Sequence, residues 1–377
     1  MKKIVIIGGS GFIGSNLTKT LVAKGYSVIV IDAFTSQIHG KDYRKSVLYQ
    51  SLCNICTIVR ADVRKSAKWR EYLEGAFAIV HLAAETGTGQ SMYQISRYTD
   101  VNIEGTSSLL EALGRTKNKP ERIVVASSRA IYGEGKYYCD EHGFQFPSSR
   151  GEADMAMGVF DPLCSACGKT MHPMSTDENS RIQPTSIYGI TKQVQEQMVL
   201  LYGKMTGMSA IALRYQNVYG PGQSLKNPYT GILSIFSTAM LHDNQIEIFE
   251  DGEESRDFVY IDDIVKATIL AIEKVETSNY AVNVGSGIPV SVLKVAETLK
   301  RLYGSKSDIH VGGKYRIGDI RHNFADLLLA RNTLGYTPSM TFDDGVKIFA
   351  HWVMSQDVYP DKYENSMAEL KQKGLLK

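Results

Sequence analysis

Residues 3–17, KIVIIGGSGFIGSNL, place a short apolar run directly before a glycine-rich turn and the start of a helical pattern. The glycines are Gly8, Gly9, Gly11 and Gly14, which satisfy both G-x-G-x-x-G and G-x-x-G-x-x-G. Glycine allows a tight turn and lets a pyrophosphate approach the backbone, and the following helix offers free N–H groups to that anion. A strand, a glycine turn and a helix in this order predict a dinucleotide-binding site.

Asp32 indicates which dinucleotide binds. It ends the second apolar run, SVIVID, 18 residues after Gly14. A carboxylate at this point accepts hydrogen bonds from the ribose hydroxyls of adenosine and repels a 2′-phosphate. Residues 33 and 34 are alanine and phenylalanine, so neither supplies an arginine to pair with that phosphate. We therefore expect NAD rather than NADP; a structural turn beside a surface aspartate is the alternative interpretation.

The rest of the first half alternates Val/Ile-rich apolar runs with helical patterns, including helices over about 92–115 and 186–205 and a strand over about 209–215. Runs that are apolar on both faces are typical of parallel strands buried under helices. We predict an α/β fold with a doubly wound parallel (Rossmann) sheet in residues 1–215. Residues 216–350 are expected to form a smaller, partly interleaved α/β substrate domain, and residues 351–377 a C-terminal helix or tail. Residues 134–185 break the rhythm and are interpreted as a Cys-rich insertion.

Composition excludes several classes of protein. The 377 residues are 43% hydrophobic and 22% charged, with a formal net charge of +2. This is an ordinary globular balance, and no basic stripe favours nucleic-acid binding. No run approaches the ~20 apolar residues that span a bilayer, and the N-terminal run is too short for a signal peptide. We expect a cytoplasmic protein with no nucleic-acid or membrane partner.

Tyr188 and Lys192 form Y-x-x-x-K within SIYGITKQVQEQ, which has a helical pattern. Residues four apart lie on one face of a helix. A nearby ammonium favours phenolate, so we expect Lys192 and the cofactor to lower the pKa of Tyr188 toward neutrality. The spacing is common, and an exposed helix pair is the alternative interpretation.

An ordered set of motifs over about residues 1–350 resembles the extended short-chain dehydrogenase/reductases, specifically the nucleotide-sugar epimerases and dehydratases. The motifs are GGSGFIG (8–14), HLAA (81–84), VASSRAIYG (125–133), the Tyr188/Lys192 pair, LRYQNVYGPG (213–222), RDFVYIDD (256–263) and RIGDIRH (316–322). The resemblance implies an NAD-dependent enzyme that acts on a nucleotide-diphosphate sugar. It also implies a homodimer formed through the helices near 92–115 and 186–205.

The same resemblance implies a role for individual residues. Ser128 would hydrogen-bond the reacting sugar oxygen, Tyr188 would act as general base and acid, and Lys192 would bind the nicotinamide ribose. The expected cofactor-binding residues are Gly8, Gly11, Phe12, Ile13, Gly14, Asp32, Asp62, Val63, Ala83, Ala84, Asn102, Tyr188, Lys192 and Tyr215. The expected substrate-binding residues are Ser128, Asn217, Arg256, Arg316 and Asp319. Arginine suits a diphosphate because its fork pairs with phosphate oxygens.

The residues after Ser128 narrow the reaction. Dehydratases that this chain resembles carry Asp-Glu there, and decarboxylating relatives carry Glu at the second position, whereas this chain has Arg129 and Ala130. We therefore expect a 4-epimerase that retains its NAD. A narrower resemblance, in ETGTGQSMY (85–93), SSRAIYGEGKYYC (127–139) and QNVYGPGQSLKNPYTGILSIF (216–236), is to dTDP-L-rhamnose 4-epimerases, which form dTDP-6-deoxy-L-talose. The alternatives are a UDP-hexose 4-epimerase, a nucleotide-4-keto-sugar reductase and a non-catalytic NAD-sensing protein.

The insertion carries a pattern of metal ligands. Cys139-x-x-His142 is followed, after 21 intervening residues, by Cys164-x-x-Cys167-Gly. Three sulfurs and one nitrogen in two such pairs are typical of structural zinc. We predict a closed zinc site beside the redox chemistry; incidental loop cysteines, with His142 or His172 solvated, are the alternative. Cys53 and Cys56 lead into an apolar strand and are interpreted as core or loop residues.

Overall fold

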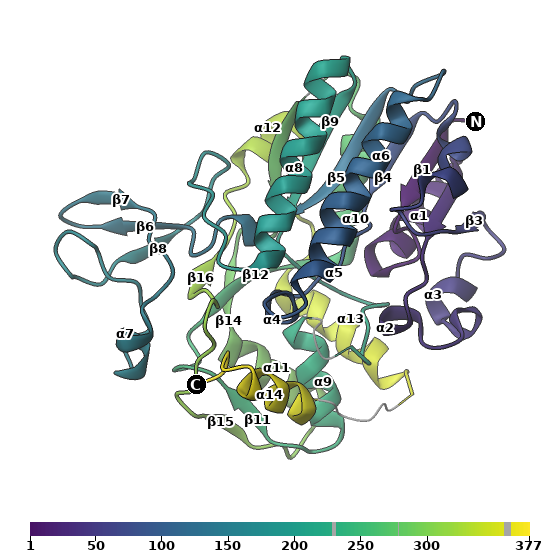
Figure 1. Cartoon of the computed structure of the whole chain (residues 1–377). Helices are drawn as coiled ribbons and strands as arrows, with labels where there is room; N and C mark the ends of the chain where they lie inside the picture. Colours follow the sequence, from purple (N-terminus) through teal and green to yellow (C-terminus); the bar gives the residue numbers. More distant parts are fainter. Residues whose placement is uncertain (228–230, 278, 358–362) are drawn as a thin grey trace.

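The computed structural model describes residues 1–377 except 228–230, 278 and 358–362. Its centre is a seven-stranded sheet with helices on both faces (Figure 1). The spatial order is β3 (Thr57–Arg60), β2 (Ser27–Asp32), β1 (Lys3–Ile7), β4 (Ala78–His81), β5 (Arg122–Ser128), β9 (Ser209–Tyr215) and β13 (Asn279–Val284). Every neighbouring pair is parallel. The predicted doubly wound parallel sheet is confirmed.

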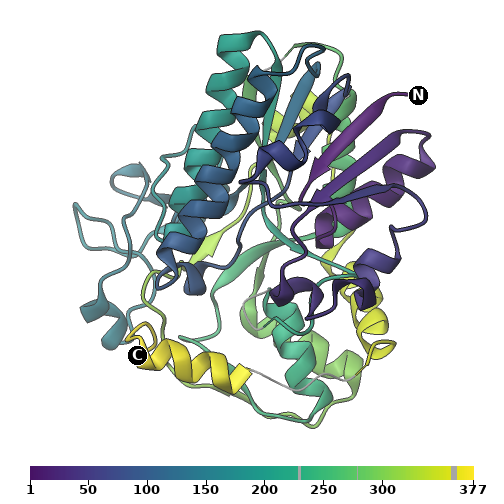
Figure 2. The same cartoon turned by 45° about the vertical axis from the view of Figure 1, so that its right-hand side comes forward.

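Alternate residues of the central strands serve two cores. Ile4 and Ile6 join one core, which also takes residues of α1 (Phe12–Ala23) and α10 (Ile261–Glu273). Val5 and Ile7 join the other, under α6 (Gly105–Gly114) and α8 (Ile187–Thr206). Figures 1 and 2 show α6 and α8 side by side over one face of the sheet. Because both faces of each strand are buried, the strand sequences are apolar runs without polar alternation.

The helix predicted near 92–115 is interrupted. It consists of α5 (Ile95–Thr99), a π-helical turn η4 (Asp100–Glu104) and α6. The wide turn carries Asn102, which is fully buried. Such π turns are frequent at functional sites because they reposition side chains within a helix.

The seventh strand of the central sheet comes from the C-terminal half of the chain, since β13 pairs with β9. Most of the remainder of that half lies below the central sheet in Figure 1, whereas α10 and α12 (Leu328–Leu334) pack against the sheet itself. The other strands of this half are β10 (Asn217–Tyr219), β11 (Ile246–Ile248), β12 (Ser255–Tyr260), β14 (Pro289–Ser291), β15 (Ile309–Val311) and β16 (His322–Asn323). Its other helices are α9 (Ile232–Leu241), α11 (Val292–Tyr303), α13 (Phe342–Met354) and α14 (Tyr363–Gln372).

The segment predicted as an insertion projects from one side of the molecule (Figure 1). It contains an antiparallel sheet of β6 (Lys136–Cys139), β7 (Gly143–Gln145) and β8 (His172–Met174), with a short helix α7 (Glu152–Ala156). A small core of its own gathers Tyr137, Cys139, Cys164 and Met171. So small an apolar core leaves the distal part of the insertion dependent on other contacts for order.

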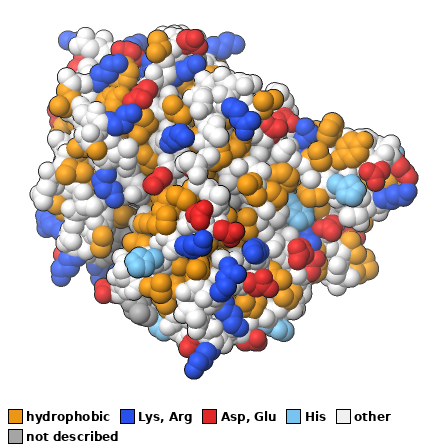
Figure 3. All heavy atoms as spheres, turned by 180° about the vertical axis from the view of Figure 1, so that it is seen from behind, with side chains coloured by type: hydrophobic (Ala, Val, Ile, Leu, Met, Phe, Trp, Pro, Cys, Tyr) orange, Lys and Arg blue, Asp and Glu red, His pale blue; other side chains and the backbone are white. Residues whose placement is uncertain are grey.

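Short elements connect these units: α2 (Ser36–His39), η1 (Tyr43–Lys45), α3 (Val47–Gln50), η2 (Ser66–Lys68), η3 (Arg70–Leu73), α4 (Thr88–Ser91) and η5 (Arg129–Ile131). On the face seen in Figure 3, acidic and basic side chains are interspersed. Among the described residues, no helix combines the length and apolar character required to cross a bilayer.

Candidate active site

The glycine turn lies between β1 and α1. A Cβ on Gly8, whose φ is +81°, would lie 2.6 Å from the Ala83 nitrogen, and one on Gly14 would lie 2.6 Å from the Gly9 Cα. These two glycines therefore allow β1, α1 and β4 to pack closely. A Cβ on Gly11 would meet only the Gly8 oxygen, at 3.6 Å, so the backbone is open at this point. Helix α1 begins at Phe12 without a side-chain cap, which leaves its first N–H groups available to an anion.

Asp32 lies at the end of β2, beside this turn. Its two carboxylate oxygens accept hydrogen bonds from the Ser10 and Phe34 backbone N–H groups, each at 2.9 Å. Burial raises the pKa of Asp32, and these hydrogen bonds partly offset that effect. Each oxygen retains a second lone pair, so the carboxylate can still accept a ribose hydroxyl. These acceptor oxygens fit the ribose hydroxyls at the adenosine end of NAD.

The other predicted cofactor residues also lie near the carboxyl edge of the sheet, but the polar groups of Asn102 and Tyr215 are bonded to protein. Asp62 pairs with Arg64 at 2.6 Å, and Val63 packs against Gly105. Asn102 uses its amide on protein: it donates to the Glu85 oxygen and the Thr191 hydroxyl, and accepts from the Glu85 nitrogen. The Tyr215 hydroxyl is bonded to Thr268 on α10 at 2.7 Å. Asn102 therefore fixes the loop after β4, and Tyr215 is tied to α10; direct contact of either residue with the cofactor stays a prediction.

Ser128 and Tyr188 come from different elements and are brought together. Ser128 ends β5, and Tyr188 lies in the first turn of α8, which Ser186 caps through its hydroxyl and the Gly189 nitrogen. A Cβ on Gly189 would lie 2.5 Å from the Ala130 oxygen, so only glycine lets α8 approach η5 this closely. The Ser128 hydroxyl, which accepts from the Ala130 nitrogen at 3.2 Å, thereby lies close enough to the Tyr188 hydroxyl to lower its pKa.

The electrostatics of Tyr188 differ from the sequence expectation. Burial raises the pKa of Tyr188 above its ordinary value, because it outweighs the lowering by the Ser128 hydroxyl and by the charge of Arg129. The cation that lowers the pKa of Tyr188 in this structure is Arg129, and the expected lowering by Lys192 together with NAD stays a prediction. Sequence spacing placed Lys192 on the correct helix face but could not show where its flexible side chain ends.

Lys192 is almost completely buried, with 3% of its surface exposed. Its ammonium donates to the Gln195 amide oxygen at 2.7 Å. Burial lowers the pKa of Lys192 to about 7, and the carboxylate of Glu196 opposes that shift. Gln195 in turn donates to Thr106 at 2.9 Å, so the amine belongs to a fixed polar network inside the α8 face of the sheet.

The predicted substrate residues form a second cluster. Arg256 on β12 and Arg316 both pair with Asp319, at 3.0 and 2.7 Å. Burial acts to raise the pKa of Asp319, but the Arg316 and Arg256 charges outweigh it and hold that pKa well below its usual range. Asn217 on β10 lies nearby, since β10 pairs with β12. Two guanidinium groups held in place by one carboxylate suit the recognition of a diphosphate.

Arg129 is a residue that sequence reasoning missed as a functional candidate. It follows Ser128 directly, and its Nε donates to the Asn217 side-chain oxygen at 2.9 Å. Burial and then the Arg256 charge lower the pKa of Arg129 to about 10. The sequence analysis counted it only as the absence of an acid. Its place immediately after a strand-ending serine is the signal that could have identified it.

The four predicted metal ligands converge. One ligand atom from each of Cys139, His142, Cys164 and Cys167 lies within 4.8 Å of all the others. The Cys139 sulfur is 3.6 Å from the His142 Nδ1 and 3.7 Å from the Cys167 sulfur. His172 stands apart and faces Asp140 at 3.6 Å.

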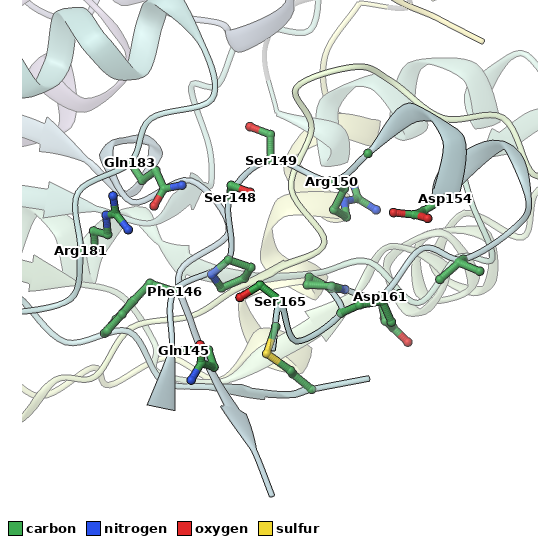
Figure 4. Close-up of a pocket in the computed structure, with 16 residues that line it drawn as sticks. Gln145, Phe146, Ser148, Ser149, Arg150, Asp154, Asp161, Ser165, Arg181 and Gln183 are labelled. Carbon is green, nitrogen blue, oxygen red and sulfur yellow. The ribbon is translucent and has the colours of Figure 1, made fainter. Parts of the chain in front are cut away.

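A cavity of about 410 Å³ lies within the insertion, lined by residues between Gln145 and Gln183 (Figure 4). Arg150 and Asp154 are on one side of it and Arg181 on the other. None of the predicted catalytic or cofactor residues lines this cavity. It is therefore separate from the site built around Ser128 and Tyr188.

Comparison with known proteins agrees with this geometry. A model of the NAD dependent epimerase/dehydratase family matches residues 4–149 and 164–285. A dTDP-L-rhamnose 4-epimerase of Burkholderia thailandensis is 36% identical over 357 residues, which cover 94% of this chain and 96% of that protein. A putative UDP-glucose 4-epimerase of Methanocaldococcus jannaschii is 29% identical over 94% of this chain and 99% of that protein.

Solved structures give the same result. The UDP-glucuronic acid 4-epimerase of Bacillus cereus, in complex with UDP-glucuronic acid and NAD, matches with a TM-score of 0.76 at 25% identity, covering 93% of this chain and 99% of that one. The sequence-based resemblance is confirmed, and the chain is an NAD-dependent enzyme that belongs to the NAD dependent epimerase/dehydratase family.

Proposed function

We propose that the enzyme inverts the configuration at C4 of a nucleotide-linked sugar by transient oxidation and reduction. The observation that carries this proposal is the closeness of Tyr188 to Ser128, together with Arg129 and Ala130 as the two residues after Ser128. The pair can move a proton at a sugar hydroxyl. Neither of the following residues supplies the carboxyl acid–base group that loss of water requires.

The chain's own residues would divide the work as follows. Bound NAD supplies the acceptor and donor of hydride. Tyr188 takes the proton of the sugar's 4-hydroxyl and later returns it, while Ser128 orients the reacting oxygen. Arg256 and Arg316 hold the diphosphate, so the oxidised sugar can turn about its phosphate link and present its other face to Tyr188. Lys192 orients the nicotinamide ribose.

For the substrate we propose dTDP-L-rhamnose, converted to dTDP-6-deoxy-L-talose. Support comes from the dTDP-L-rhamnose 4-epimerase of Burkholderia thailandensis, which is similar to this chain over nearly its whole length. UDP-hexoses are the second candidate, because relatives with UDP-sugar names are also similar over most of this chain. A panel of dTDP- and UDP-sugars followed by NMR for inversion at C4 separates the two candidates.

Replacing Tyr188→Phe tests the reaction itself. We expect C4 inversion to fall at least about 100-fold, because the variant lacks the group that transfers the proton. Tyr138→Phe, which changes a tyrosine of the insertion that is 37% exposed, is the matched control and should retain activity. Inversion at the wild-type rate by the Tyr188 variant would refute the mechanism.

We also propose that Cys139, His142, Cys164 and Cys167 hold a structural zinc ion. Ligand atoms ~2.0–2.3 Å from a tetrahedral zinc are ~3.3–3.8 Å apart, which agrees with the separations of 3.6 and 3.7 Å. Metal analysis of the purified chain should give about one zinc per chain, lost in Cys164→Ser and kept in Cys53→Ser. Less than a tenth of an equivalent in the wild type would contradict this. A cytoplasmic location, also proposed, would keep these thiols reduced.

Two alternative functions can be distinguished from that of an epimerase. A 4-ketoreductase would consume NAD(P)H, whereas an epimerase needs no added reductant. A non-catalytic NAD sensor has no need of Tyr188 close to Ser128, so the presence of this pair in the chain favours an enzyme. A homodimer built on α5, α6 and α8 is the proposed assembly.

A further inference from the structure

Arg129 differs from other arginines near the site in the kind of group that accepts its hydrogen bond. Arg150, Arg214, Arg256 and Arg321 each have a carboxylate oxygen within about 3 Å. Among the residues that the structure describes, Arg129 has no carboxylate within 4.0 Å, and its recorded hydrogen bond is to a neutral amide, that of Asn217. The Arg129 side chain is partly buried, so its charge is only partly solvated and an anionic ligand beside it would be favourable.

The surroundings of Arg129 indicate the direction from which that ligand comes. One neighbour in the chain is Ser128, which lies close to Tyr188 at the reacting end of the site. On the other side, Asn217 fixes the guanidinium Nε, and β10 pairs with β12, which carries Arg256. The Arg129 charge thus lies between the hydroxyls that handle the sugar and the arginine assigned to the diphosphate.

The nearby Arg256 makes an anion between them favourable. The charge of Arg256 lowers the pKa of Arg129, and the more distant charges of Asp319 and Glu134 oppose that effect. Arg256 is partly balanced by Asp319 at 3.0 Å and Glu254 at 3.7 Å. An anionic oxygen placed beside Arg129 would relieve the repulsion and receive charge-assisted hydrogen bonds from the free edge of the guanidinium.

We propose that Arg129 is a specificity-determining substrate residue, which binds an anionic oxygen group of the nucleotide sugar next to the reacting ring. The phosphate that bears the sugar and a carboxylate on the sugar share this chemistry. The inference rests on the proposed function for the identity of the ligand as a nucleotide sugar. Its test measures binding, so it can fail or succeed independently of turnover.

The experiment compares Arg129→Gln and Arg129→Lys with the wild type in their NAD-loaded form, by calorimetric titration. The probes are UDP and dTDP, their monophosphates, and the pair UDP-glucose and UDP-glucuronic acid. Arg181→Gln, which removes an exposed arginine of the insertion, is the matched control. Thermal unfolding and the NAD content of each variant verify that it is folded and loaded.

If the anion is the phosphate that bears the sugar, Arg129→Gln lowers the affinity for the nucleoside diphosphate by about 10- to 100-fold and leaves the affinity for the monophosphate unchanged. If it is a sugar carboxylate, the diphosphate is unchanged and the preference for UDP-glucuronic acid over UDP-glucose falls by a similar factor. In either case Arg129→Lys should retain part of the affinity. Equal affinities of the Gln variant and the wild type for every probe, or no binding of either diphosphate by the wild type, would overturn the proposal.

Discussion

The Lys192 ammonium is buried beside Gln195, and burial lowers the pKa of Lys192 to about 7. An unfolded lysine titrates near 10.5. The folded state therefore binds fewer protons between these values, and the cost of burying the charge is fully present below pH 7 and disappears as the pH rises toward 10.5.

It follows that Lys192→Met should stabilise the NAD-free chain, by a few kcal/mol at pH 6 and by little at pH 10. The measurement is the thermal unfolding midpoint of both proteins across this range. We expect the two curves to converge at high pH. A constant difference between them would show that the amine is not desolvated in the folded state.

For individual residues, the sequence predicted those features of the site that depend only on local spacing along the chain. Tyr188 and Lys192 are four apart on one helix, and the glycine turn is contiguous, so both are local patterns. The partners of Arg129 and Lys192 could not be predicted, because they depend on side-chain rotamers and on residues such as Asn217 that are distant in the sequence.

Among the elements, the approach of α8 to η5 depends on Gly189. A methyl group there would lie 2.5 Å from the Ala130 oxygen and 2.9 Å from the Pro184 side chain. Gly189→Ala should move Tyr188 away from Ser128 and lower kcat by about 100-fold, since a displacement of ~1 Å can have that effect. NAD content should be unchanged.

The matched control is Gly114→Ala on α6, where an added methyl group would meet only the Tyr202 hydroxyl, at 3.9 Å. Steady-state assays with the preferred sugar nucleotide give kcat, and the absorbance of the released cofactor gives the NAD content. Equal turnover in the two variants would mean that the position of α8 does not limit the reaction.

The insertion is joined to the substrate site through buried charges. Arg150, near the cavity in Figure 4, pairs with Glu134 at 3.0 Å and Glu250 at 2.8 Å and donates to the Asp319 backbone oxygen. Both carboxylates are inaccessible to solvent. Arg150 therefore fixes the segment that carries Asp319, the partner of both predicted diphosphate arginines.

Arg150→Met should consequently raise KM for the sugar nucleotide more than it lowers kcat, and leave NAD binding intact. It should also destabilise the fold by about 3 kcal/mol, because Glu134 and Glu250 each lose a cation and keep only their contacts with Arg321. Lys169→Met, which removes an exposed ion pair of the same insertion, is the control. A fall in kcat alone would argue against a positioning role.

Element boundaries were predictable where the pattern was regular, as in the strand near 209–215, which is β9 (Ser209–Tyr215). The π turn at Asp100–Glu104 was not, because the side chains around it keep a helical pattern. Nor could the sequence show that β13 completes the central sheet, since its pairing with β9 joins segments about 70 residues apart.

For the whole molecule, the exposed apolar residues of α8 predict self-association. Ile190, Leu201 and Met205 are 43%, 59% and 75% exposed. Apolar surface on one helix is typical of a contact with another chain. The double change Leu201→Glu and Met205→Glu should convert a dimer to a monomer in light scattering after gel filtration. The matched control, with glutamate at Ile348 and Met354 of α13, should leave the dimer intact. A wild-type protein that is already a monomer would disprove the proposed assembly.

The central claim, that hydride leaves and returns to the same carbon within one enzyme, is tested most directly with a nucleotide sugar carrying deuterium at C4. The chain is incubated with the labelled substrate without added cofactor or reductant, and both C4 epimers are examined by NMR and mass spectrometry. The account predicts that inversion proceeds and that both epimers keep the deuterium. Loss of the label to solvent, or inversion only after NADH is added, would contradict it.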